Sequence, residues 1–306
     1  SLIFLSLILF FFFHKKDDHN KNSIFLLSKE TSILINNWFM MYFLSVVLVG
    51  TIYPIFLDVV SSEKISIGPP FYHKLIIPFL IPFLLVMAIG PKLKWIKSDF
   101  SKKFSLVLLF VISVLLSIFI IKTLKVQFLI NSILLTFIFY LFFITVRDFF
   151  IQKFSNLSQS VAHFGFSLFL LSILFNNILS TEVITNLKVG DTFQSEKYKI
   201  YFEDLNQKKE KNFVSLVGKF VIENLEGDIQ IMKPELRIYN QPNIATSEAY
   251  IKTNFFSDNF MTMNYVQNQE YLNIRYQIKP LMIWIWISVI MITAGGLISV
   301  FKKNEN

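Results

Sequence analysis

Apolar runs separated by short charged loops dominate the chain. A helix needs about 20 apolar residues to cross a bilayer, and six runs approach or meet this length: Trp38–Val59, Leu75–Ile89, Phe104–Ile121, Phe128–Val146, Val161–Leu179 and Leu281–Phe301. A seventh run, Leu2–Phe13, is too short to span, and we expect it to be the end of a truncated helix in a longer protein. The pattern predicts an α-helical polytopic membrane protein with about seven transmembrane segments, the first truncated.

One long polar stretch, Ser180–Gln277, lies between the last two runs. Residue types typical of half-buried strands occur in six segments of it: Tyr198–Phe202, Phe213–Ile222, Leu236–Tyr239, Ala249–Ile251, Phe260–Val266 and Tyr271–Tyr276. Turn residues separate them, at Glu226–Asp228 and Gln241–Asn243 for example. We therefore expect a small antiparallel β domain, a sandwich or a barrel. The predicted division is a helical bundle at 1–179, the β domain at 180–277, a final helix at 278–301 and a tail at 302–306.

Composition supports the membrane class, because 54% of the residues are hydrophobic and only 16% are charged. A net charge of +8 is compatible with nucleic acid as a partner. The lysines, however, gather in short loops beside the apolar runs, as membrane orientation requires, so nucleic-acid binding is not expected. The chain contains no cysteine, so any thiol chemistry in its pathway must come from partners.

The distribution of lysine and arginine between the loops predicts the orientation of the chain. Thirteen lie in alternate loops and the tail: Lys15, Lys16, Lys21, Lys29, Lys92, Lys94, Lys97, Lys102, Lys103, Arg147, Lys153, Lys302 and Lys303. The opposite short loops hold four: Lys64, Lys74, Lys122 and Lys125. Because positive loops stay inside, we expect the first set and the C-terminus in the cytoplasm or its equivalent, and the β domain on the outer face.

His163 is the only ionisable side chain within the run Val161–Leu179. An ionisable imidazole at membrane depth is costly and needs a partner, a proton pathway or a metal. One axial imidazole is a common way to hold a haem, and the small residues Ala162 and Gly165 would let either a flat macrocycle or a neighbouring helix come close. The alternative is a histidine at the interface or in the core, hydrogen-bonded to a nearby carbonyl.

The other histidines are weaker candidates. His14 and His19 lie in a charged loop, where a solvated surface explains them. His73 is expected at the outer end of its helix, whereas His163 is expected near the inner end of its own. The two imidazoles should then be separated by most of the roughly 30 Å hydrocarbon thickness, so they cannot share one iron. In the β domain, Glu235 and Arg237 are two apart in a strand and would pair on one face.

Several motifs, in order along the chain, resemble the CcmF family, the membrane subunit of the cytochrome c haem lyase. They are SKETSILINN at Ser28–Asn37, VGTIYP at Val49–Pro54, KISIGPPFY at Lys64–Tyr72, AIGPKLKW at Ala88–Trp95, VAHFGFSL at Val161–Leu168, PELRIY at Pro234–Tyr239, SEA at Ser247–Ala249 and IRYQIKPLMIWIWISVIMITAGGLI at Ile274–Ile298. Each motif is short, and the set covers nearly the whole chain. The chain is thus similar to the C-terminal part of that family.

The resemblance implies a role in cytochrome c maturation. In the family, a CcmE-like chaperone delivers haem, a CcmH-like partner presents apocytochrome c, and the haem is attached to the Cys-x-x-Cys-His motif of the apocytochrome. By the same resemblance His163 is one axial ligand of a b-type haem held in the bundle. A bacterial inner (plasma) membrane with the β domain in the periplasm is implied, or a mitochondrial inner membrane.

The family's tryptophan-rich haem-binding loop, outer-face haem histidines and second bundle-haem ligand have no match in the chain. They would lie in the N-terminal part of the same subunit, and we therefore expect this chain alone to be inactive in the lyase reaction. Gly68, Pro69 and Pro70 are expected to form either an outer docking loop or a helix-entry turn. Alternative functions are a haem exporter or other polytopic transporter, and a scaffold in which His163 binds no cofactor.

Overall fold

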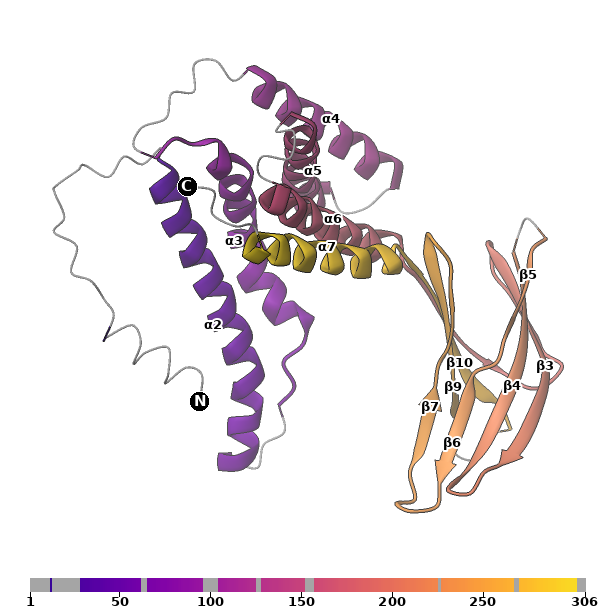
Figure 1. Ribbon diagram of the computed structural model, residues 1–306. Helices are drawn as coiled ribbons and strands as arrows, with labels where there is room; N and C mark the ends of the chain where they lie inside the picture. The colour runs from indigo at the N-terminus through magenta and orange to yellow at the C-terminus, as the bar shows by residue number, and fades with distance from the viewer. Residues whose placement is uncertain are drawn as a thin grey trace. The chain divides into compact units, whose positions relative to one another are not determined.

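The computed structural model of the chain describes residues 12, 28–61, 65–95, 104–124, 128–151, 157–224, 227–266 and 270–301. Within these ranges six long helices form, α2 (Lys29–Ser61), α3 (Pro69–Ile89), α4 (Phe104–Leu124), α5 (Phe128–Ile151), α6 (Leu157–Leu179) and α7 (Met282–Phe301), all long and apolar enough to cross a membrane (Figure 1). They confirm the six full-length runs. The run Leu2–Phe13, His14 and His19 lie outside the described residues. The chain divides into two compact units, Ser1–Lys103 and Phe104–Asn306.

Helix α2 begins nine residues before the apolar run predicted from the sequence. Ser28 caps it, because the backbone N–H of Thr31 donates to Ser28 Oγ at 3.1 Å, satisfying one of the free donors of the first turn. The polar residues between Ser28 and the apolar run are therefore already helical. The cap explains why hydropathy alone placed the start too late.

In the first unit, α2 and α3 form a hairpin that the short 3-10 helix η1 (Gly90–Lys92) completes. The backbone N–H of Lys29 donates to the carbonyl of Lys94 at 2.8 Å, and Tyr42 Oη donates to the carbonyl of Leu75 at 3.0 Å. The Tyr72 ring lies so close to Gly50 that a Cβ there would come within 2.9 Å of its carbons. The motifs that begin at Ser28 and end at Trp95 thus meet each other, and so do those that contain Gly50 and Tyr72.

In the second unit α5 packs against both α4 and α6, and α6 packs closely against α7. Ile121, Leu135 and Phe139 are buried where α4 and α5 meet, and Leu171, Leu174 and Phe175 of α6 cover them. Helix α5 is the most buried of the six. It is therefore the centre of this unit's helical part, and α6 is placed by neighbours on two sides.

The polar stretch folds as two antiparallel sheets, which confirms the β domain and makes it a sandwich. One sheet has the order β1 (Thr181–Leu187), β10 (Leu272–Pro280), β9 (Ser257–Tyr265) and β8 (Tyr250–Thr253). The other has the order β2 (Thr192–Gln194), β3 (Tyr198–Lys209), β4 (Phe213–Asn224), β6 (Glu235–Tyr239) and β7 (Ala245–Glu248), with β5 (Ile229–Met232) paired to β4. The sequence had not indicated β1, β2, β5 or β7.

Side chains from both sheets fill the sandwich. The rings of Phe202 and Phe220 stack at 4.3 Å between centroids, and Met261 and Met263 lie fully buried opposite them. Tyr276 is also buried, with its ring edge-on to that of Tyr198 at 5.1 Å. Alternation along β3 places Tyr198 and Phe202 inward and the intervening Lys199 and Tyr201 outward, as expected for a strand covered on one face.

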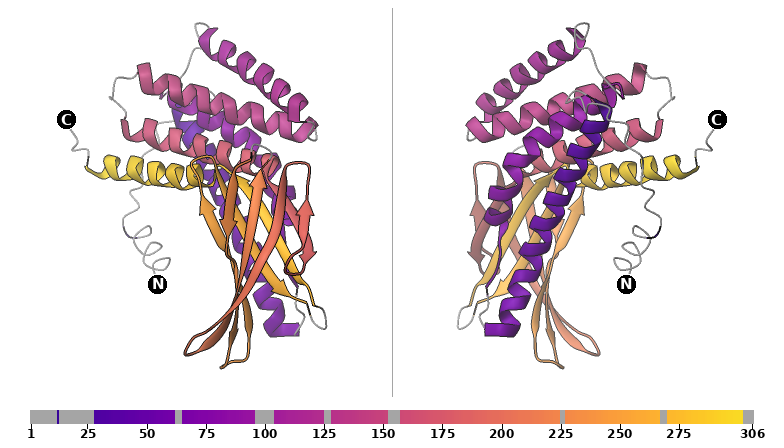
Figure 2. Two further views of the ribbon diagram at one scale, coloured as in Figure 1. Left: turned by 90° about the vertical axis from the view of Figure 1, so that its right-hand side faces the viewer. Right: turned by 90° about the vertical axis from the view of Figure 1, so that its left-hand side faces the viewer.

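The sandwich is attached to the membrane part through α6 and α7 (Figures 1 and 2). Strand β1 follows α6 directly and pairs with β10, which leads into α7, and this register places Thr181 opposite Ile278. Asn176 Nδ2, near the end of α6, donates to the carbonyl of Pro280 at 2.6 Å. The end of α6 and the start of α7 are therefore held together by a sheet ladder as well as by helix packing.

The close approach of α6 and α7 yields a test with a neighbouring control. A Cβ on Gly295 would lie 2.7 Å from the backbone nitrogen of Ala162, whereas a Cβ on Gly296 meets nothing within 4 Å. We expect Gly295→Leu to lower the thermal midpoint in detergent, with overpacking costing about 1–3 kcal/mol, and Gly296→Leu to leave it almost unchanged. Equal effects of the two changes on tryptophan-monitored unfolding would refute this account of the contact.

The buried phenols make the sandwich sensitive to alkali. Burial raises the pKa of Tyr276 to about 12, and burial also raises the pKa of Tyr198. The folded state therefore disfavours ionisation of these phenols. Their contribution to the free energy of unfolding is fully present below the ordinary tyrosine pKa of about 10 and is lost as pH rises through the folded pKa. Each pKa unit by which the folded state differs corresponds to about 1.4 kcal/mol of this free energy. Tyr276→Phe should move the alkaline unfolding midpoint, followed by circular dichroism, to higher pH. An unmoved midpoint would count against this role.

Candidate functional site

His163 lies in the second turn of α6, which begins at Leu157. The sequence placed it within the first turn or two of its helix, and the structure agrees. The residue is half-buried. At about 1.5 Å rise per residue, it lies roughly 24 Å along α6 from Leu179, where the helix meets the sandwich. The imidazole is therefore at the end of α6 remote from the β domain.

The small residues beside His163 are used by α7. A Cβ on Gly165 would lie 3.0 Å from the backbone nitrogen of Ile292 and from the carbonyl of Ser288, and Gly295 approaches Ala162 still more closely. Of the two alternatives for Ala162 and Gly165, a neighbouring helix is the one that the structure shows. Their small size allows backbone contact between helices and leaves no space for a macrocycle on that face.

Helix α5 occupies another face of α6. Ser167 Oγ lies 3.2 Å from Thr145 Oγ1 of α5, and Ser167 Oγ also donates to the carbonyl of Phe164 at 2.8 Å. One turn earlier the Phe164 ring packs against Phe142 of α5 at 5.5 Å between centroids. Contacts with two helices thus fix the rotation of α6 about its own axis, and with it the direction in which His163 leaves the helix.

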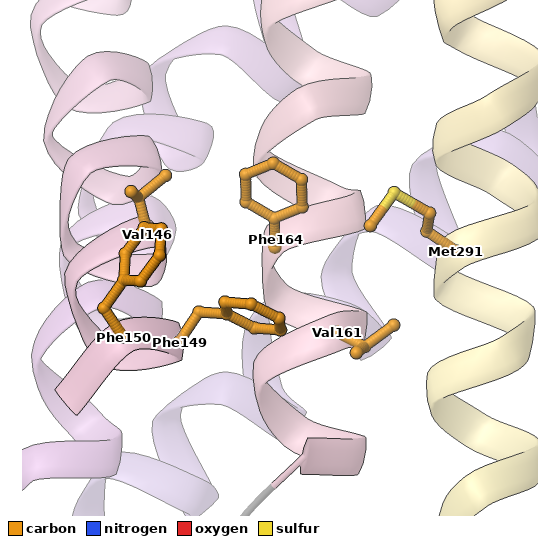
Figure 3. Close-up of a pocket in the computed structure, with 6 residues that line it drawn as sticks. All are labelled: Val146, Phe149, Phe150, Val161, Phe164 and Met291. Atoms are coloured by element: carbon orange, nitrogen blue, oxygen red, sulfur yellow. The ribbon is translucent and has the colours of Figure 1, made fainter. Parts of the chain in front are cut away.

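An apolar pocket opens between α5, α6 and α7 at this level (Figure 3). It measures about 260 Å³ and is lined by Val146, Phe149, Phe150, Val161, Phe164 and Met291. His163 is not among the lining residues. Successive residues of a helix turn by about 100°, so Val161 and His163, two apart, leave α6 in nearly opposite directions. A group bound through His163 would therefore lie on the other side of α6 from this pocket.

The donor set fits one axial haem ligand better than a metal ion held by protein alone. Among the described residues no group of three His, Cys, Asp or Glu is placed to hold a metal ion. A half-buried imidazole that is the only ionisable side chain of α6 fits a haem, because the porphyrin supplies four nitrogens and the protein needs to add only axial donors. A single haem-ligating imidazole is thus compatible with the described surroundings of His163.

The loop at Gly68 is the entry to α3. Gly68 is the N-cap, Pro69 and Pro70 occupy the first turn, and the backbone N–H of Phe71 donates to the carbonyl of Gly68 at 3.2 Å. Proline suits this position because the first-turn N–H groups have no helical partner. The helix-entry interpretation is correct. Pro69 and Pro70 are exposed, and their part in docking stays a prediction.

In the sandwich the predicted pairing of Glu235 and Arg237 is confirmed, with Arg237 Nε 3.0 Å from Glu235 Oε2. Ser215 Oγ donates to the same carboxylate oxygen at 3.1 Å, and the Arg237 guanidinium lies 5.2 Å from the Phe213 ring centroid. The hydrogen bond to Glu235 raises the pKa of Arg237 further. These contacts indicate a structural cluster on the sheet surface and no acid–base couple.

Sequence reasoning missed a polar pocket of about 450 Å³ at the edge of the sandwich. Its polar side chains are Asn224, Asp228, Gln230, Lys252, Asn254, Ser257, Asn259 and Tyr276. Asn259 Nδ2 donates to Gln230 Oε1 at 2.7 Å and so joins the two sheets. The lining comes from β4, β5, β8, β9 and β10 and the turns between them, so no local motif could have indicated the pocket.

Comparisons with known proteins agree with the resemblance found in the sequence. Residues 178–280 match the family described as CcmF C-terminal beta-sandwich. The cytochrome c-type biogenesis protein CcmF of Pseudomonas fluorescens is 26% identical over 293 residues, which cover 90% of this chain and 44% of that protein. For CcmF of Escherichia coli the identity is 24% over 283 residues, with 89% and 44% covered.

A solved structure of a cytochrome c heme lyase CcmF shares the fold. It matches with a TM-score of 0.69 at 20% identity, covering 90% of this chain and 46% of that one. The resemblance to the C-terminal part of CcmF therefore extends through the membrane helices and the sandwich. The chain spans less than half the length of the curated CcmF relatives that it matches.

Proposed function

We propose that this chain, which is similar to the C-terminal part of CcmF, serves cytochrome c maturation and supplies His163 as one axial ligand of a b-type haem held among its membrane helices. The observation that carries the proposal is the placement of His163. It is a half-buried ionisable side chain in the second turn of α6, in a chain that matches cytochrome c-type biogenesis proteins over 90% of its length.

The helices around His163 would fix how the imidazole presents its nitrogen. Contacts of Gly165 with α7 and of Ser167 with α5 hold the rotation of α6, so the Cα–Cβ bond of His163 leaves the helix in one direction. The packed helices around His163 would hold the imidazole in place as an axial donor. A haem bound there supplies one-electron chemistry at iron, and its potential depends on the axial ligands and burial.

The second axial ligand would come from the rest of the subunit. The curated CcmF relatives are more than twice as long as the stretch matched here, and we assign that ligand, with further haem-binding groups, to the part without a counterpart in these 306 residues. This chain alone would then be inactive. The enzyme would be the assembled haem lyase, a cytochrome c synthetase.

The partners of the sandwich follow from the same proposal. We place residues 180–277 in the periplasm of a bacterial inner membrane, or in the equivalent mitochondrial space, with the bundle at 1–179 and the helix at 278–301 in the membrane and the tail 302–306 inside. A CcmE-like chaperone would deliver haem and a CcmH-like protein would present apocytochrome c. Both thiols of the thioether bonds would be those of the apocytochrome's Cys-x-x-Cys-His motif, and this chain itself contains no cysteine.

A haem spectrum of the natural protein that contains this chain tests the assignment. We expect a b-type reduced-minus-oxidised absorbance that falls at least several-fold in His163→Ala. His73, the other histidine within the described residues, is the matched control. His73→Ala should leave the spectrum unchanged, because His73 lies in the first turns of α3 and is not assigned to the haem.

The result separates the candidate functions. An unchanged spectrum in His163→Ala rejects His163 as the ligand, and a haem-free wild-type protein favours a scaffold. Co-purification with CcmE-like and CcmH-like proteins is expected for a lyase subunit. A haem-containing protein that binds neither partner would favour an exporter or another transporter.

A further inference from the structure

The turn between β8 and β9 meets the first residue after the sandwich. The backbone N–H of Leu281 donates to the carbonyl of Phe256 at 2.8 Å. The turn itself is closed by a bond from the N–H of Asn254 to the carbonyl of Ser257 at 2.9 Å. Leu281 directly precedes α7, so this hairpin tip is held at the point where the sandwich ends and the membrane helix begins.

Two phenylalanines lie side by side at this tip and face outward. The side chains of Phe255 and Phe256 are 53% and 67% exposed, and their rings meet edge-on at 5.0 Å. The Phe255 ring also packs edge-on against Trp284, in the first turn of α7, at 5.0 Å. We call Phe255, Phe256 and Trp284 the junction aromatics. They join the hairpin to α7 and leave a large apolar surface uncovered within the described structure.

The ends of the membrane helices determine what lies beside this surface. Helix α6 ends at Leu179 and α7 begins at Met282, and both are long and apolar enough to span, so the outer edge of the hydrocarbon falls near these residues. Trp286, two residues after Trp284, is 64% exposed on the same helix. Tryptophan is enriched at this depth in membrane proteins, because its amphipathic ring suits the headgroup region.

We propose that the hairpin tip is a membrane-surface anchor, in which Phe255 and Phe256 insert into the headgroup and upper acyl region of the bilayer. The Leu281–Phe256 hydrogen bond fixes the level of the tip relative to α7, and the contact of Phe255 with Trp284 holds the exposed phenylalanines beside that helix. The anchor gives the sandwich a third attachment to the membrane, beside its two covalent connections. It does not depend on haem.

Single-cysteine labelling tests the anchor, because the chain contains no cysteine of its own. Nitroxide is attached to Phe256→Cys in the chain reconstituted into phosphatidylcholine nanodiscs. Collision rates are measured with oxygen, which dissolves in lipid, and with a water-soluble nickel chelate. We expect the oxygen-to-nickel ratio to be several-fold higher at position 256 than at a control position on the outer face of the sandwich.

Tyr201→Cys is the control. Tyr201 is 38% exposed on β3, and Figure 1 shows β3 on the side of the sandwich away from α7. Asn254→Cys is a second labelled site, which is exposed in the same turn and leaves both phenylalanines in place. Because Phe256→Cys removes one of the two anchoring rings, the label at position 254 tests the tip with both rings present. The oxygen-to-nickel ratio should be raised there too.

Two outcomes would overturn the proposal. If the labels at 254 and 256 collide with the nickel chelate as readily as the label at 201, the tip is in water. If they are shielded from both reagents, protein covers the tip and lipid does not. A ratio that rises at 254 and 256 but not at 201 supports insertion into lipid.

Discussion

Backbone contact between α6 and α7 is the constraint on which the second unit depends. Gly165 and Gly295 bring the two helices so close that a Cβ at either position would meet backbone atoms of the partner. In lipid there is little hydrophobic gain from pairing apolar helices, so such close van der Waals packing is a principal source of their affinity. The whole sandwich lies between α6 and α7 in the sequence. The contact between these helices therefore fixes both the face of α6 that carries His163 and the base of the β domain.

The sequence predicted the helices well because a long apolar run that crosses a bilayer must satisfy its backbone hydrogen bonds internally, and a helix does so. It was less successful where polar residues extend an element. Helix α2 continues through a polar first section owing to the Ser28 cap, and β3 continues to Lys209 because its polar end pairs with β4, with Gln207 opposite Leu216. Strand β1 was missed since Ile184 faces outward while Thr181 and Thr185 face partly inward, which hides the alternation.

The candidate site was predictable only in part. An ionisable side chain in an apolar run is visible in the sequence, and so are the small residues beside it. The neighbour that packs against those small residues is α7, which lies more than a hundred positions later in the sequence. No local pattern indicates this contact. Ser167 and Thr145 meet across two helices for the same reason, and the polar pocket gathers residues from five strands and their turns.

Attachment at both ends explains how α6 can hold an imidazole in one direction. Rotation of a helix by one residue, about 100°, would move His163 from one neighbour to another. The glycine contacts near His163 oppose that rotation at one end, and the β1–β10 ladder with the Asn176–Pro280 bond opposes it at the other. The sandwich therefore stabilises the orientation of a residue roughly 24 Å away along the helix, and its insertion between α6 and α7 has a structural reason apart from any partner that it binds.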